Sequence, residues 1–190
     1  MTKNVKRLAS GPITGHALRL TPGTLLMKSL KDAAESIFHR SDTNDNARSV
    51  FIITAVGSLS DTVTLRMANA DASKPNPIKT FEGERFEIVS MTGTFARDRK
   101  CHVHISLSRS DGAVIGGHLV EGKVFTTCEL VLGSMSSVEF RREQDNETGF
   151  TELVVRQIED GRGMAFFEYL YNNGGLCFGL CLILWSLLRS

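Results

Sequence analysis

The chain has 190 residues, of which 42% are hydrophobic and 23% are charged, and this ordinary globular composition excludes wholesale disorder. Its length fits one well-cored domain with appendages rather than two full domains. The formal net charge of +1 excludes a global attraction to nucleic acid, so any DNA binding must come from a local basic patch.

The N-terminal residues 1–14 predict a basic flexible arm. Lys3, Lys6 and Arg7 meet no acidic residue nearby, which makes them candidate phosphate contacts; a solvated arm without a partner is the alternative. No apolar run with a cleavage site follows, and the four cysteines form no C-x-x-C pair. These features favour an intracellular protein, cytoplasmic or nuclear.

The segment from 15 to 142 predicts the folded domain. A strand at 16–20 leads through Thr21-Pro22-Gly23, a turn with a possible helix cap, into an amphipathic helix at 25–38. After a polar loop, β-type patterns dominate at 50–56, 62–67, 79–81, 86–92, 102–108, 113–120, 124–132 and 137–141. We expect an α+β fold with a largely antiparallel sheet of about seven strands and one main helix.

The C-terminal part changes character. Residues 143–173 read as a linker or extension, with a polar stretch at 144–149 and a short strand or helix at 152–160. Residues 174–190 form an apolar tail whose uncharged core is shorter than the ~20 residues of a spanning helix. The alternatives are membrane association through 166–188, a hydrophobic helix docked on the domain, or a tail produced by alternative splicing or an imperfect gene model.

The most informative strand carries two histidines. Because side chains alternate along a strand, His102 and His104 share one face with two serines, while the apolar residues between them face the core. A three-residue hairpin loop at 110–112 sets His104 opposite His118 and Ser106 opposite Gly116. A two-residue loop would instead move His118 to the apolar face.

His102, His104 and His118 thereby form a candidate Zn²⁺ site. Neutral imidazole is a borderline-soft ligand, and three protein ligands leave a fourth position for water or a small molecule. Glu129, or a side chain of a neighbouring subunit, is the candidate partner of a ligating histidine. Hydrogen-bonded histidines at the surface or at an interface are the alternative reading.

Three glycines near the histidines suggest structural roles. Gly112 suits the left-handed position of the hairpin turn. Gly116 and Gly117 indicate a bulge or a close approach of another backbone segment, and ligand binding is the alternative.

Five short motifs follow one another along the chain: Arg19-Leu-Thr-Pro-Gly, Ala55-Val-Gly-Ser-Leu-Ser-Asp, Phe86-Glu-Ile-Val-Ser-Met-Thr-Gly-Thr, His102-x-His104 and Asp111-Gly-x-x-x-Gly-Gly-His-Leu. In this order they resemble the PPC domain, the "plants and prokaryotes conserved" module once catalogued as a domain of unknown function. The motifs span about two thirds of the chain.

The resemblance implies an α+β fold that assembles as a homotrimer, and it implies prokaryotic and plant nuclear relatives. The family's histidines match His102, His104 and His118 one for one. The plant relatives also carry an AT-hook, whose Arg-Gly-Arg-Pro core is absent here; Gly161-Arg-Gly-Met is only a fragment of it. Direct minor-groove binding is therefore not carried over.

Two functions compete. The first is a trimeric regulatory or DNA-associated binding module, in which three arms combine weak phosphate contacts. The second is a metal-dependent, three-histidine enzyme or small-molecule sensor that uses a metal-bound water. No nucleophile beside a base and no phosphate-binding glycine loop is evident, and Glu87, Glu121 and Glu129 are candidates only as carboxylates near strands. Catalysis stays open, with the binding module favoured.

Overall fold

A computed structural model describes residues 8–40, 46–71 and 73–158. These residues form one helix and seven strands, which in chain order are β1 (Thr14–Leu20), α1 (Leu26–Phe38), β2 (Ser49–Arg66), β3 (Ile78–Phe95), β4 (Cys101–Ser108), β5 (Val114–Met135), β6 (Val138–Gln144) and β7 (Thr151–Gln157). All pairings between these strands are antiparallel. The predicted α+β class, with a mostly antiparallel sheet and one helix, is confirmed.

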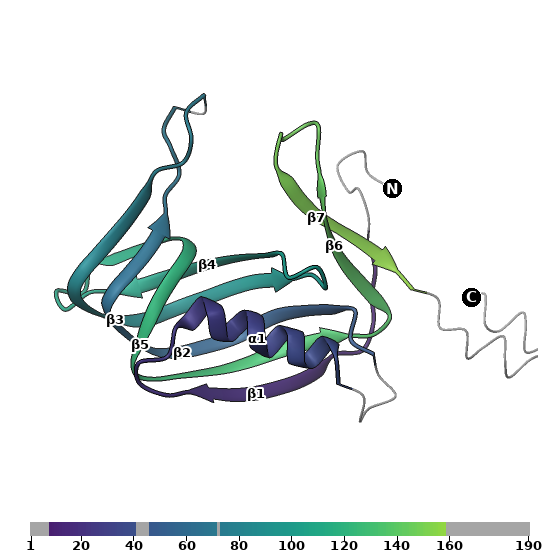
Figure 1. The fold of residues 1–190 in the computed structure, drawn as a ribbon, viewed down its shortest axis with the longest axis horizontal. Helices are drawn as coiled ribbons and strands as arrows, with labels where there is room; N and C mark the ends of the chain where they lie inside the picture. The colour runs from purple at the N-terminus through teal and green to yellow at the C-terminus, as the bar shows by residue number, and fades with distance from the viewer. Residues whose placement is uncertain (1–7, 41–45, 72, 159–190) are drawn as a thin grey trace, which may run out of the picture. The chain divides into compact units, whose positions relative to one another are not determined.

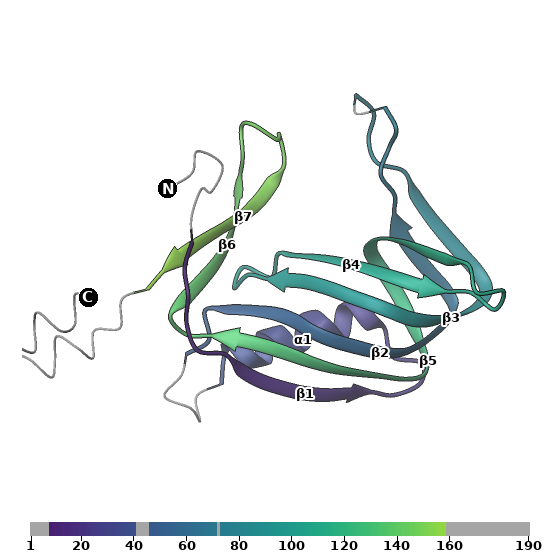
Figure 2. The same ribbon diagram turned by 180° about the vertical axis from the view of Figure 1, so that it is seen from behind.

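The larger sheet has the order β1-β5-β2-β3-β4, and β4 also pairs with β5. Strands β2, β3, β4 and β5 therefore form a closed ring. Strand β1 lies outside this ring and pairs with the C-terminal part of β5. Helix α1 lies across one face of the sheet, as the two opposite views show (Figures 1 and 2). The ring encloses fully buried apolar side chains, which include Leu59, Val63, Leu65, Phe86, Leu107, Leu119 and Val124.

Three long strands replace pairs of shorter predicted ones. Segments 50–56 and 62–67 belong to β2, segments 79–81 and 86–92 to β3, and segments 113–120 and 124–132 to β5. The Gly57-Ser58 signal, which predicts a strand end, marks an irregularity within β2, where the register shifts between Gly57 and Leu59. A side chain at Gly57 would collide with the Thr127 backbone across the pair. Such irregularities bend a strand without ending it.

Helix α1 begins one residue later than predicted, and it is capped from outside its own sequence. Its N-cap residue, Leu25, supplies no side-chain hydrogen bond. The Glu121 carboxylate on β5 instead accepts hydrogen bonds from the backbone N–H groups of Met27 (2.7 Å) and Lys28 (3.3 Å). Glu121 is thus a helix cap, with a negative charge at the positive end of the helix dipole. Glu121, which the sequence offered only as a carboxylate near a strand, therefore has a structural role at the start of α1.

The β6–β7 hairpin runs from the end of the predicted domain into the predicted linker at 143–173. Strands β6 and β7 pair in register from Val138 with Gln157 to Gln144 with Thr151, so the polar stretch 144–149 is largely the turn between them. The domain boundary expected at Arg142 falls inside β6. The Phe140 N–H donates to the Arg48 carbonyl at 3.1 Å, which ties the hairpin to the chain just before β2.

Several sequence predictions lie outside the described residues. Lys3, Lys6 and Arg7 of the basic arm are among them, and so is the apolar segment 166–188. Among the residues that the structure describes, no helix has the length and apolarity needed to cross a membrane.

Candidate metal centre

Strand β4 separates its histidines from the core. Val103 and Ile105 are buried at 0% and 2% exposure, whereas His102 and His104 are exposed on the other face. The alternation predicted for this strand is therefore confirmed. The apolar side chains hold β4 against the ring interior, so the backbone presents both imidazoles to the same outer surface.

The β4–β5 hairpin brings in the third histidine. The Arg109 N–H donates to the Ala113 carbonyl at 2.8 Å, and Gly112 closes the three-residue loop at φ +81°. This geometry pairs His104 with His118 and Ser106 with Gly116, as predicted. Loop length thereby decides that His118 points to the histidine side of the sheet and not into the core.

The three imidazoles converge. One ring nitrogen from each of His102, His104 and His118 lies within 4.8 Å of the others. The Nε2 atoms of His102 and His104 are 2.9 Å apart and form a hydrogen bond, in which the tautomers decide which ring donates. The ring centroids lie 4.8 Å (His102–His104), 5.1 Å (His102–His118) and 5.6 Å (His104–His118) apart.

The electrostatics of the cluster suit metal ligation. Burial lowers the pKa of His118 to about 4, and the neighbouring histidines and arginines add to this shift. Burial and the adjacent His104 also lower the pKa of His102, whereas Glu152 acts in the opposite direction. Both rings are consequently neutral at pH 7, the form in which an imidazole can bind a cation. The donor set fits a Zn²⁺-type ion held by three histidines.

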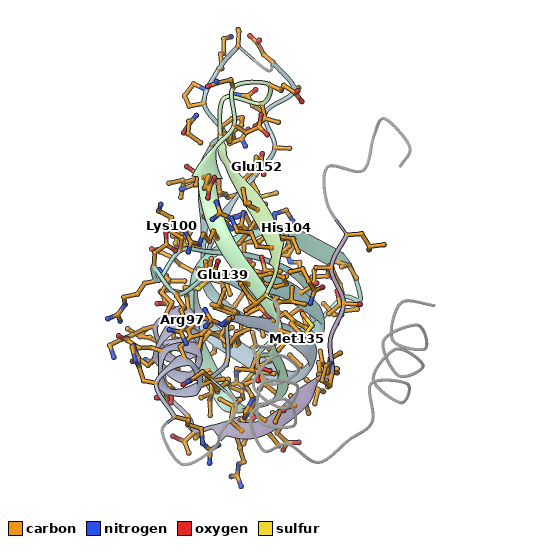
Figure 3. The ribbon with its side chains drawn as sticks, turned by 90° about the vertical axis from the view of Figure 1, so that its right-hand side faces the viewer. Arg97, Lys100, His104, Met135, Glu139 and Glu152 are labelled. Carbon is orange, nitrogen blue, oxygen red and sulfur yellow. The ribbon has the colours of Figure 1, made fainter. Side chains whose placement is uncertain are left out.

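The β6–β7 hairpin brings two charged residues to the cluster that sequence reasoning did not assign to it. Arg142, 9% exposed, donates from Nη2 to the Thr94 hydroxyl at 2.8 Å, and Thr94 pairs with His102 across β3 and β4. Glu152 of β7 acts electrostatically on both His102 and Arg142. Figure 3 labels Glu152 on this hairpin, with His104 and Lys100 close to it in that view. No local pattern signals these contacts, because they join segments far apart in the sequence.

The carboxylates proposed from the sequence lie elsewhere. Glu129 is exposed near the opposite end of β5, where it pairs with Arg19 of β1 and Val56 of β2, so it is not the expected partner of a ligating histidine. Glu87 pairs with Ser108 at the end of β4 away from His102. The carboxylate that acts on the cluster is that of Glu152.

The paired glycines of β5 lie against neighbouring backbone. A Cβ atom at Gly116 would stand 2.8 Å from the Ile105 carbonyl oxygen, and one at Gly117 would stand 2.9 Å from that of Arg66. Both distances are too short for a side chain. Beside His118, β5 can therefore approach β4 on one side and β2 on the other only with glycine at these positions.

Comparisons with known proteins place the chain. The sequence model of the Plants and Prokaryotes Conserved (PCC) domain matches residues 8–136. Bifunctional protein GlmU of a Synechococcus strain is 30% identical over 154 residues, which cover 80% of this chain and 22% of that protein. The GlmU of a second Synechococcus strain is 31% identical over 149 residues. The chain thus spans about a fifth of the length of these curated relatives.

Solved structures share the fold. A protein of Salmonella enterica is 28% identical at a TM-score of 0.66, with 78% of this chain and 96% of that chain covered. A metal-containing protein of Archaeoglobus fulgidus is 25% identical at 0.63, with 78% and 99% covered. A candidate DNA-binding protein of Bacteroides thetaiotaomicron is 22% identical at 0.60, with 74% and 91% covered. Together with the match over residues 8–136, these findings show that the chain belongs to the family of the plants and prokaryotes conserved domain, PCC or PPC.

Proposed function

We propose that this protein is a regulatory binding module whose three histidines hold a divalent cation of the Zn²⁺ type. The observation that carries the proposal is the convergence of ring nitrogens from His102, His104 and His118 within 4.8 Å. Three imidazole ligands supply a tetrahedral ion with all but one of its ligands. A relative that is 25% identical is described as metal-containing, which supports the same reading.

A binding role is favoured over a catalytic one by what surrounds the cluster. When bound, the cation would supply Lewis acidity and a site for an exchangeable ligand. Glu152 is the carboxylate that acts on His102, but it also acts on the Arg142 guanidinium, so it is not dedicated to the histidine cluster. A metal-dependent enzyme or sensor is the alternative, with Glu152 as its base.

Self-association as a homotrimer is the second element of the proposal. On the face of β2 and β5 away from α1, Phe51 and Ile53 pack against Gly133, and Ile53 is 51% exposed. Val56 on the same strand is 59% exposed. Exposed β-branched side chains on a sheet face that none of the described residues covers with a helix favour burial against another chain. We assign this face to further copies of the same chain, as the family resemblance implies.

DNA association is a separate candidate function, supported by the fold shared with the candidate DNA-binding protein of Bacteroides thetaiotaomicron. The contacts would come from Lys3, Lys6 and Arg7, three times over in a trimer. Deleting residues 1–10 should weaken a salt-sensitive interaction with duplex DNA in a mobility-shift titration. Equal DNA binding with and without residues 1–10 would contradict the hypothesis that this arm binds DNA.

Elemental analysis of the purified protein tests the metal proposal. We expect near-stoichiometric zinc per chain, and its loss in the triple variant His102→Ala, His104→Ala, His118→Ala compared at the same oligomeric state. His39→Ala is the matched control, because His39 is an exposed histidine outside the cluster. If neither the intact protein nor the variant takes up zinc, even after incubation with excess Zn²⁺, the proposal is wrong.

A further inference from the structure

The β6–β7 hairpin places a buried arginine beside the histidine cluster. Arg142 is 9% exposed, and its Nη2 donates to the Thr94 hydroxyl at 2.8 Å. Thr94 is the residue directly opposite His102, so both side chains stand on the same face of the sheet. We propose that Arg142 anchors an oxyanion-binding subsite next to the histidines, and that the ligand of this site is a small molecule carrying a carboxylate or a phosphate group.

The pairing of Arg142 is incomplete in the unliganded protein. Its Nε is shielded from solvent and has no hydrogen-bond partner among the described residues. A guanidinium usually uses two adjacent N–H groups to hold a carboxylate or phosphate, and a buried donor without an acceptor is destabilising. An oxyanion against the Nε edge would supply the missing acceptor.

The adjacent arginine, Arg141, differs from Arg142 in exposure and in hydrogen bonding. Arg141, the preceding residue of β6, is exposed and paired through Nε and Nη2 with the Glu139 carboxylate, at 2.8 and 3.2 Å. Its donors are satisfied within the protein and its side chain faces away from that of Arg142, because side chains alternate along a strand. Of these two arginines, Arg142 is the one on the same side as the histidines, and it is the one whose Nε lacks a hydrogen-bond partner in the described part of the chain.

The charges around the cluster also favour an anion. Arg66 lies directly opposite His118 on β2, so a second guanidinium accompanies Arg142 near the histidines. Glu152 is the carboxylate whose negative charge counteracts the effect of Arg142 on His102. With a divalent cation bound, positive charge would exceed negative charge in a partly buried site, where charges interact more strongly than in water. A ligand that brings one or two negative charges would balance this excess.

Thr94 can complete the subsite. Because its Oγ1 accepts the Arg142 hydrogen bond, the hydroxyl proton is available for a ligand oxygen. One oxygen of the anion would take the Arg142 and Thr94 donors, and another would take the open position of the cation. This second contact rests on the proposed metal function, whereas the arginine subsite does not need it.

Calorimetric titration of the full chain, with and without Zn²⁺, tests the subsite. The probes are inorganic phosphate and acetate, and acetamide is the uncharged analogue of acetate. We expect both anions to bind, acetamide not to bind, and Arg142→Met to weaken anion binding about tenfold or more, as the loss of a charge-assisted hydrogen bond implies. Arg141→Met, the matched control, should bind the anions like the unchanged protein. The tighter anion identifies phosphate or carboxylate as the ligand group.

Two milder variants guard against misfolding of Arg142→Met. Arg142→Lys keeps the positive charge but loses the paired N–H groups of the guanidinium, and Thr94→Val removes only the hydroxyl. Each variant should weaken anion binding. Wild-type affinity in all variants that stay folded, or no binding of either anion to the folded wild-type protein, would overturn the subsite. Zinc analysis of the same samples separates the two ideas. Protein that takes up no zinc from excess Zn²⁺, yet binds phosphate through Arg142, contradicts the metal site alone.

Discussion

His104 and His118 lie directly opposite each other in the β4–β5 pair, with ring centroids 5.6 Å apart and ring planes at 83°. The relationship depends on a three-residue loop ending at Gly112, and on β5 approaching β4 closely at Gly116. A one-residue slip would turn His118 toward the core. Any cation site here is therefore coupled to the register of one hairpin.

Substituting Gly116 by alanine should weaken zinc binding without removing a ligand. The new methyl group would stand 2.8 Å from the Ile105 carbonyl oxygen, so β4 and β5 must separate and His118 must move from His104. We expect at least a tenfold loss of zinc affinity in a chelator-competition titration, corresponding to about 1.4 kcal/mol. Ser106→Ala changes the residue opposite Gly116 without adding volume and should leave zinc affinity near wild type. Unchanged affinity in Gly116→Ala would show that the register does not limit the site.

The metal-free protein should lose stability in mild acid because of His118. Its folded pKa of about 4 lies below the ordinary value of 6.5, so the unfolded chain takes up the proton first. The stabilisation is present in full above pH 6.5 and is lost as the pH falls toward 4. Urea unfolding at pH 7.5 and 4.5, with chelator present, should show a smaller acid-induced loss for His118→Asn than for wild type. Equal losses in the two proteins would contradict the lowered pKa.

Removing the carboxylate that caps α1 should destabilise the domain. Glu121→Ala leaves the Met27 and Lys28 N–H groups without their side-chain acceptor, and we expect a loss of about 1–2 kcal/mol in the free energy of unfolding. Glu129→Ala, on the same strand but exposed, should change the free energy by about 0.5 kcal/mol or less. Chemical denaturation monitored by circular dichroism provides the measurement. A Glu121→Ala value within that smaller range would refute the capping role.

A charge on the face of β2 and β5 away from α1 should dissociate the proposed trimer. Ile53→Glu places a carboxylate where a second copy would bury the side chain, so light scattering after size-exclusion chromatography should report a mass shift from trimer toward monomer. Ile78→Glu is the control, because Ile78 is an isoleucine of similar exposure, 60% against 51%, near the tip of the β2–β3 hairpin. If the Ile53 variant remains as trimeric as wild type, another surface forms the assembly.

Local sequence patterns were sufficient for much of the candidate site. Period-two alternation in β4 separates His102 and His104 from Val103, and the Ser110-Asp111-Gly112 turn sets the register with His118. Both features depend on residues close together in the chain. Strand ends were predicted less well, since Gly57 reads as the end of a strand yet serves as an irregularity within β2.

The α+β class, the helix and the face on which the histidines stand could all be predicted from the sequence, because each follows from periodicity or from turn chemistry within a few residues. The tertiary structure was needed to show that β5 also pairs with β2 and so closes the ring, that Glu121 caps α1 from a distant strand, and that Arg142 and Glu152 join the histidine cluster. These contacts join segments far apart in the chain. They form only when burial of the shared core brings the strands together, and no short sequence pattern records them.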